Sequence, residues 1–458
     1  MPRNDEERIN ETSLELLTEP GIRIEHEEIY EKLLRAGAAA GTSSDTVSIP
    51  KELVSESVEQ APDTVVFGDR TENRGTSTAE NRTLIWSVPG MNILRNGAHR
   101  EFTSSDMADT AALLERLPAV DGVFGMAMSD VPPMARGVTG LRIMAENSRK
   151  HIRVLSFCPE GCDAICEMKE VVDSSPWFSM GFTAHGPLRW TNLALEIFSR
   201  TAGRSIPVTI NGEPMAGVSG PVTLAGSAAV GNAEILAGLV INQILEPGRP
   251  CIYNLGLAHI FDMKTSIAVT GAPENHLLAG ISARMGSFYG LPSGSWVSTE
   301  SMCPDSQAAI EKTAGFLTHQ QNGIDLIWGA GQLESELTMS PAQAVIDNEI
   351  IEYTKRYIRG VEVSEETLAL DVAREVGITG NYLSHTHTLE HFRDEFFEPA
   401  VLFRKKRSDW THEGRRNLAA AAEETADALI SAEREPILNN DQTEALSKIE
   451  KRFLETCC

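Results

Sequence analysis

The chain lacks the sequence motifs that mark several common enzyme folds. Its 458 residues contain no G-x-x-x-x-G-K-S/T phosphate-binding loop and no G-x-S-x-G nucleophile elbow. No G-x-G-x-x-G motif follows an early predicted strand, which argues against a doubly wound sheet that binds a dinucleotide. The sequence therefore points away from phosphate-loop, nucleophile-elbow and dinucleotide-binding enzymes.

Basic residues are scarce, with 40 Lys and Arg against 65 Asp and Glu, and the formal net charge is −25. This balance argues against nucleic acid and anionic membranes as partners, because both are bound through basic surfaces. Uninterrupted apolar runs of about 18 residues are also missing. The most apolar stretch, Leu224 to Leu245, contains Asn232, Glu234, Asn242 and Gln243, so we expect a buried helix rather than a membrane span.

Cysteine is sparse, with seven residues scattered through the chain, which fits a reducing compartment better than a disulfide framework. The first ten residues are charged and include no apolar segment that would direct export. We therefore expect a cytoplasmic protein. Cys158, Cys162 and Cys166 are spaced by four residues, but this spacing fits no iron–sulfur motif and favours buried structural cysteines.

Short apolar segments alternate with longer segments of helical periodicity from about residue 118 onward. This alternation predicts a parallel sheet, and eight units over roughly 270 residues predict an α/β fold of the closed (β/α)8 TIM barrel type. The expected domains are an N-terminal α+β extension (1–115), the barrel (116–395) and C-terminal helices (396–458). The expected barrel strands are Gly122–Met128, Ile152–Phe157, Trp177–Thr183, Ile206–Asn211, Pro250–Leu255, Ser293–Val297, Ile324–Trp328 and Tyr382–His385.

The extension is expected to hold short strands or hairpin arms of its own, at Thr64–Phe67, Thr83–Trp86 and Met91–Leu94.

Residues 322–350 are the most informative stretch for locating chemistry. The apolar run Ile324–Trp328 predicts a buried strand, and the glycines Gly329 and Gly331 follow it directly. Glycines at the carboxyl end of a buried strand allow close approach of another backbone or a ligand. Gln332 and Glu334 come just beyond, at the position where barrel enzymes carry their catalytic groups.

The other predicted strand ends carry a mixture of aromatic, acidic and amide side chains. They offer Asp130, Cys158 with Glu160, His185, Asn211 with Glu213, Tyr253 with Asn254, Trp296 with Glu300, and His385 with His387. The two histidines would share one face of a strand, as metal ligands do, but a zinc site needs a third protein ligand. No strong third candidate accompanies them, so we predict no metal site.

Four segments of the chain carry a resemblance to a known family. They are Gly329–Thr338 with Val345–Ile350, Glu213–Gly226, Gly290–Ser293 followed by Asp305 and Gln307, and His387–Arg393. Together they resemble the trimethylamine/glycine betaine methyltransferase family, whose members depend on corrinoid proteins, and the resemblance spans roughly residues 5–400. The chain contains no Asp-x-His-x-x-Gly motif to hold a corrinoid, so the cobalamin or other corrinoid must arrive on a partner protein.

The resemblance also bears on the substrate. Family members that act on trimethylamine use pyrrolysine to activate it, at a place that corresponds to about Trp296–Pro304, where this chain has only standard residues. A quaternary amine such as glycine betaine needs no activation, because it is already cationic and leaves as a neutral amine. We therefore expect a methyltransferase that demethylates a quaternary amine and transfers the methyl group to the Co(I) corrinoid of its partner.

Such a cation has no hydrogen to donate, so it requires aromatic faces and nearby acids, while a carboxylate tail requires hydrogen-bond donors. We expect catalytic roles for His387, Glu334 and Gln332. The expected substrate-binding residues are Trp296, Trp328, Tyr253, Asn211 and Glu300.

Two other functions stay open on the sequence alone. One is a metal-dependent barrel lyase or hydrolase that uses His385, His387 and a carboxylate. The other is a non-catalytic protein that binds quaternary amines. For the leading hypothesis the expected partners are a small quaternary amine and a corrinoid protein, with the enzyme itself a homo-oligomer.

Overall fold

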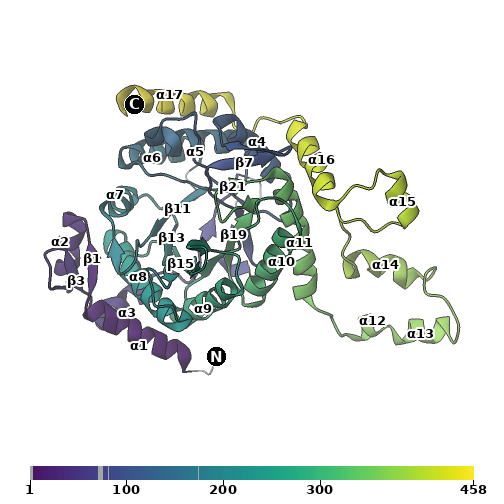
Figure 1. The fold of residues 1–458 in the computed structure, drawn as a ribbon, viewed down its shortest axis with the longest axis horizontal. Helices are drawn as coiled ribbons and strands as arrows, with labels where there is room; N and C mark the ends of the chain where they lie inside the picture. The colour runs from purple at the N-terminus through teal and green to yellow at the C-terminus, as the bar shows by residue number, and fades with distance from the viewer. Residues whose placement is uncertain (1–3, 71–75, 81, 174, 458) are drawn as a thin grey trace.

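The structure is a computed structural model that describes residues 4–70, 76–80, 82–173 and 175–457. Eight parallel strands close into a barrel in chain order, as the sequence predicts, and helices surround them (Figure 1). The strands are β6 (Leu84–Ser87), β9 (Gly122–Phe124), β10 (His151–Arg153), β11 (Phe178–Thr183), β13 (Val208–Asn211), β15 (Cys251–Gly256), β18 (Ser293–Trp296) and β19 (Leu326–Ala330). The (β/α)8 fold class is confirmed.

One predicted strand is wrong. Tyr382–His385 forms a turn that leads into α14 (Thr386–Glu395), and Tyr382 and Leu383 are exposed. The eighth barrel strand is β6, which was predicted as a short strand (Thr83–Trp86) but assigned to the N-terminal extension; it pairs with both β19 and β9. All four residues of β6 are buried, as a barrel strand requires. The barrel therefore begins before residue 116 and closes without residues 382–385.

Each barrel strand is followed by one long helix on the outside of the barrel. These are α4 (Ser104–Glu115), α5 (Arg136–Asn147), α6 (Cys162–Val172), α7 (Asn192–Thr201), α8 (Leu224–Leu245), α9 (Pro273–Tyr289), α10 (Ser306–Gln321) and α11 (Pro341–Arg359). Among the described helices, α8 is the one long and apolar enough to cross a membrane, yet most of it is buried within the protein. The prediction of a buried helix at Leu224–Leu245 is confirmed.

The N-terminal residues form a separate layer beside the barrel (Figure 1, purple). Helices α1 (Asp5–Thr18) and α3 (Lys51–Gln60) pack against α8, and α2 (Glu27–Arg35) packs on a small sheet. That sheet has the order β12-β1-β3-β2. Its strands are β1 (Ile22–Ile24), β2 (Ala39–Ala40), β3 (Thr46–Ser48) and β12 (Arg189–Trp190).

Short strands also form hairpins, most of them over the barrel's carboxyl-terminal end. One sheet joins β14 (Met215–Ala216), β16 (His259–Asp262) and β17 (Ile267–Val269). A second joins β20 (Gln332–Leu333), β21 (Thr338–Met339), β7 (Asn92–Arg95) and β8 (Ala98–Glu101). The pair β4 (Val66–Phe67) and β5 (Thr76–Ser77) lies before β6 in the chain.

After α11 the chain leaves the barrel and returns to it. It passes through α12 (Glu365–Leu368), α13 (Leu370–Val376), α14 and α15 (Arg407–His412), which project away from the barrel (Figure 1, green to yellow). Then α16 (Leu418–Ser431) packs against α11 and α4, and α17 (Asn440–Cys457) packs against α5 and α6. The predicted C-terminal helices are therefore present, and part of them belongs to the barrel's outer layer.

The interior of the barrel is packed at the amino-terminal level of the strands. The Trp86 ring stacks on His151 with centroids 5.1 Å apart, and the Phe67 ring meets Trp86 edge-on at 4.9 Å. Gly122 makes this packing possible, because a Cβ there would lie 2.4 Å from Trp86 Cδ1. These side chains form a floor, and the open space of the barrel lies above it, at the carboxyl ends of the strands.

Candidate functional site

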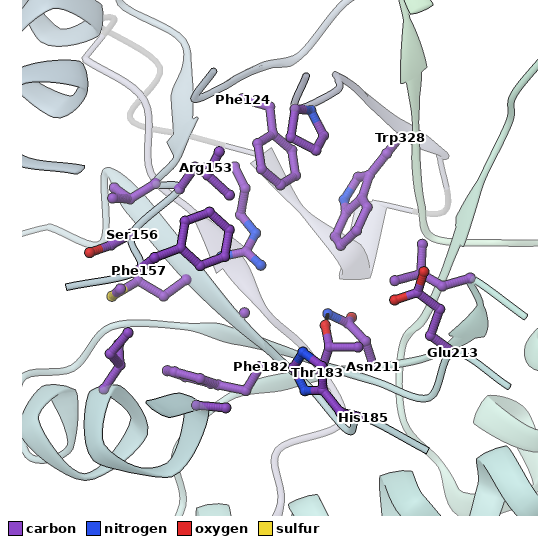
Figure 2. Close-up of a pocket in the computed structure, with 18 of the residues that line it drawn as sticks. Phe124, Arg153, Ser156, Phe157, Phe182, Thr183, His185, Asn211, Glu213 and Trp328 are labelled. Atoms are coloured by element: carbon purple, nitrogen blue, oxygen red, sulfur yellow. Dashed lines mark hydrogen bonds between the residues drawn. The ribbon is translucent and has the colours of Figure 1, made fainter. Parts of the chain in front are cut away.

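A cavity of about 310 Å³ occupies the carboxyl-terminal end of the barrel. Residues at or just after the ends of β9, β10, β11, β13, β18 and β19 line it, as expected for a TIM-barrel active site (Figure 2). Three of the predicted substrate-binding residues are in the lining: Trp296, Trp328 and Asn211.

The two tryptophans form an aromatic part of the cavity wall. Trp296 and Trp328 are paired directly across β18 and β19, and both are nearly fully buried. Trp296 Nε1 donates to Gln332 Oε1 at 2.9 Å, which fixes the indole orientation. Trp328 meets the Phe124 ring edge-on, with centroids 5.3 Å apart. Rigid aromatic faces of this kind attract cations that cannot donate hydrogen bonds.

Two carboxylic acids line the same cavity. Glu213 follows β13, and Glu336 lies in the turn between β20 and β21. Burial raises the pKa of Glu213 to about 7, and burial together with the charge of Glu213 raises the pKa of Glu336 to about 8. Strongly raised carboxyl pKa values in a cavity are typical of functional sites. A cation placed between these groups would stabilise their ionised forms.

The turn that carries Glu336 has an unusual backbone. Glu334, Ser335 and Glu336 all have positive φ angles, of 56°, 49° and 86°. Non-glycine residues rarely adopt this region, and each does so at a cost of about 1–2 kcal/mol. Backbone hydrogen bonds hold the turn, from Glu334 N to Ser301 O and from Ser335 N to Thr299 O, each at 2.9 Å. The conformation therefore costs stability and places one acid of the turn at the cavity.

The floor side of the cavity carries an ordered row of polar groups. Asn254 Nδ2 donates to Asn211 Oδ1, and Asn211 Nδ2 donates to Thr183 Oγ1, each at 3.0 Å. Thr183 and His185 are also in the cavity lining, at the end of β11. This row fixes the amide of Asn211, so its orientation is set before a ligand binds.

The structure does not bring the other predicted residues to the cavity wall. The Tyr253 hydroxyl donates to Asn232 Oδ1 at 2.8 Å, which directs Tyr253 outward to α8. Glu300 accepts from the backbone nitrogens of Thr270, at 2.6 Å, and Gly271, so it secures a loop. Gln332 acts through Trp296, as described above.

The two remaining predicted catalytic residues lie elsewhere. Glu334 faces away from the cavity, where its carboxylate lies 3.2 Å from His99 Nε2 and accepts from Thr338 Oγ1. His387 lies on α14, in the projecting segment, because the strand predicted to carry it does not exist. In the described part of the chain, no three His, Cys, Asp or Glu side chains are grouped to hold a metal ion, so His385 and His387 find no third ligand.

Among the charged residues of the lining, Arg153 and Glu336 were not predicted from the sequence. Arg153 offered a signal, because it is a charged residue inside a segment predicted to be a buried strand, and such residues need a reason to be there. Glu336 offered none, since only the left-handed turn distinguishes it from Glu334. The glycine prediction is partly confirmed: a Cβ at Gly329 would lie 2.4 Å from Val297 O, so the close approach is by a neighbouring backbone.

The predicted cysteine roles are also confirmed for the described residues. Cys158, Cys162 and Cys166 are buried free thiols, with Cys162 and Cys166 on α6.

Comparisons with known proteins place the chain among amine methyltransferases. The family model for trimethylamine methyltransferase (MTTB) matches residues 1–456. A trimethylamine methyltransferase MttB of Desulfitobacterium hafniense (strain DSM 10664 / DCB-2) is 30% identical over 444 residues, which cover 93% of this chain and 88% of that protein. A glycine betaine methyltransferase of D. hafniense (strain Y51) is 27% identical over 421 residues, which cover 89% of this chain and 87% of the relative.

A solved structure shares the fold. The monomethylamine methyltransferase MtmB of Methanosarcina barkeri superimposes with a TM-score of 0.54 at 12% sequence identity, covering 98% of this chain and 86% of that one. The resemblance found in the four sequence segments is thus confirmed by matches that run almost the whole length of the chain. The chain belongs to the trimethylamine methyltransferase (MTTB) family.

Proposed function

We propose that this protein removes one methyl group from a quaternary amine, with glycine betaine as the candidate substrate, and transfers it to the corrinoid of a partner protein. The observation that carries the proposal is the cavity in which Trp296 and Trp328 face the same space as Glu213 and Glu336. Aromatic faces and carboxylates together suit a cation without N–H groups. The similarity to a glycine betaine methyltransferase supports this choice of substrate.

The chemistry is a displacement in which the methyl carbon leaves nitrogen. The C–N bond breaks, and its electron pair stays on nitrogen, so the product is a neutral tertiary amine. Reduced cobalt of the partner's corrinoid supplies the nucleophilic electron pair. The protein's own contribution is to hold the cation so that one methyl points out of the barrel, and orientation of this kind can supply up to roughly 7–11 kcal/mol of the barrier.

The acids must not bind the cation too strongly. Nitrogen loses its positive charge as the methyl leaves, so a fully charged acid pair would favour the substrate over the transition state. Without a ligand, Glu213 and Glu336 have pKa values of about 7 and about 8, so near neutral pH part of the attraction for the cation is used to ionise them. As the amine becomes neutral these carboxyls can take up protons again. The pair therefore gives moderate attraction.

The surface around the mouth of the cavity has the apolar character of a site for transient protein binding. Loops that follow the barrel strands carry large apolar side chains that are exposed to solvent, and in a parallel barrel these loops share one face. A surface of this kind marks an interaction site. Its members are Phe157, Val218, Val222, Met263, Met302 and Leu337. A corrinoid protein seated on this face would place its cofactor over the cavity.

The test is turnover with free reduced cobalamin as the acceptor. Glycine betaine, carnitine, proline betaine, choline and trimethylamine are each incubated with the enzyme. Methylcobalamin is followed by absorbance, and the demethylated amine by mass spectrometry. We expect equal amounts of methylcobalamin and dimethylglycine from glycine betaine, and no product from trimethylamine. Tight binding of these amines without any product would instead indicate a binding protein and would overturn the proposal.

A further inference from the structure

We propose that Arg153 is the residue that binds the carboxylate of the substrate, so that the cavity selects zwitterionic betaines over cations that have no carboxylate. This inference rests on the proposed function, because it assigns the second charged group of the same ligand. Arg153 ends β10 and lines the cavity, and its side chain enters from the side opposite Glu213 (Figure 2). The cavity thus presents a cation on one side and two acids on the other.

The guanidinium of Arg153 is buried without an acidic partner among the described residues. Only 5% of the residue is exposed, and among the described residues no acidic charge acts on it. Within that part of the chain its one side-chain hydrogen bond runs from Nη2 to Thr209 Oγ1 at 3.3 Å, and its Nε has no partner. Burying an unpaired charge costs several kcal/mol by order of magnitude. An arrangement this costly is explained when a ligand supplies the missing anion.

Aromatic rings hold the guanidinium in place without using its remaining N–H donors. Its carbon lies 5.2 Å from the ring centroid of Phe124 and 5.7 Å from that of Trp328. Burial lowers the pKa of Arg153 to about 9, so it stays protonated at neutral pH. A carboxylate can accept two parallel hydrogen bonds from such a fork, which fixes both position and orientation.

Gly181 on the neighbouring strand β11 makes the space for this side chain. A Cβ at Gly181 would lie 1.6 Å from Arg153 Nη2 and 2.3 Å from Thr209 Oγ1. Any other residue at 181 would therefore push the guanidinium away from its present position. The glycine gives a second, independent way to move Arg153 without replacing it.

The first experiment uses the unmodified protein and two ligands of similar size. Glycine betaine carries a carboxylate where choline carries a neutral hydroxymethyl group. Isothermal titration calorimetry measures the dissociation constant of each. A hydrogen-bonded pair with a charged group contributes about 1.5–3 kcal/mol, so we expect glycine betaine to bind about 10- to 100-fold more tightly than choline. Equal affinity for the two ligands would overturn the inference.

The second experiment compares three variants by the same titrations. Arg153→Met and Gly181→Ala should each weaken glycine betaine by about tenfold or more, and neither should weaken choline. Gly140→Ala is the matched control, because the nearest side chain to a Cβ there is 3.5 Å away. Equal losses for both ligands would show that Arg153 is only structural. If Arg153→Met does not fold, the unmodified protein and Gly181→Ala decide the question.

These outcomes are separate from those of the proposed function. A protein that prefers glycine betaine over choline through Arg153, yet yields no methylcobalamin, would support the role of Arg153 and contradict the proposed methyltransferase activity. Turnover of glycine betaine and choline at the same efficiency would support the methyltransferase activity and contradict the role of Arg153.

Discussion

Lys312 on α10 and Asp347 on α11 form an ion pair, with Nζ and Oδ2 3.1 Å apart and both side chains fully buried. The pair supports the glycine-rich turn after β19 from behind. Lys312 Nζ also donates to Gly329 O, and Gly331 N donates to Asp347 Oδ2 at 2.7 Å. Trp328, Gln332 and the turn that carries Glu336 are therefore tied to two outer helices.

The first prediction follows from this pair. Asp347→Ala leaves the Lys312 ammonium buried and unpaired, so we expect a loss of about 3–5 kcal/mol in the free energy of unfolding, measured by urea denaturation. Lys312→Met combined with Asp347→Leu should recover most of that loss. The control is Glu352→Ala, which removes the exposed partner of Lys355 and should cost at most about 1 kcal/mol. A small effect of Asp347→Ala would mean that Asp347 is not needed to stabilise the buried Lys312 ammonium.

The second prediction concerns pH. The pKa values of Glu213 and Glu336, about 7 and about 8, are raised in the free protein, so both carboxyls carry protons at low pH. A cation binds to the ionised forms, whose population grows as the pH rises. We expect the dissociation constant of glycine betaine to fall between pH 6 and 8, by up to about tenfold per unit for each coupled proton below its pKa. Calorimetry in buffers of different ionisation enthalpy should show proton release. Glu213→Gln should flatten the profile.

The third prediction separates backbone strain from charge. Glu336 has a φ of 86°, which glycine adopts freely. Glu336→Gly should unfold at the same temperature as the parent protein or slightly above it, whereas Glu336→Gln should keep the strain. Both variants lose the carboxylate, so KM for the quaternary amine should rise in both. A Glu336→Gly variant with unchanged KM would mean that this acid takes no part in binding.

The fourth prediction concerns His387. Because His387 lies on α14 and not at a barrel strand, His387→Ala should leave kcat/KM for demethylation unchanged. The comparison is Trp328→Ala, which removes part of the cavity wall and should reduce kcat/KM strongly while the protein still folds, as checked by circular dichroism. A large loss of activity in His387→Ala would return His387 to the list of catalytic residues.

Most of the fold can be predicted from the sequence, because seven barrel strands are apolar runs between helical segments. The prediction did not assign β6 to the barrel, because Leu84–Ser87 lies between the small strands of a region that differs from the repeating strand–helix pattern. Side chains at strand ends were harder to assign. Trp296 and Trp328 were found because inward positions at strand ends follow from the barrel itself. The position of Glu336 at the cavity depends on three left-handed residues in one turn. The direction of the Tyr253 side chain depends on which face of β15 meets α8.

The floor of Trp86, His151 and Phe67 has a kinetic consequence. A chamber sealed at its base exchanges small molecules through its top alone. On the proposed function, a corrinoid protein seated there would close the chamber, so the amine would have to enter before docking and the demethylated product would leave only after the corrinoid protein dissociates. Steady-state measurements should then show a compulsory order of addition, with inhibition by excess corrinoid protein.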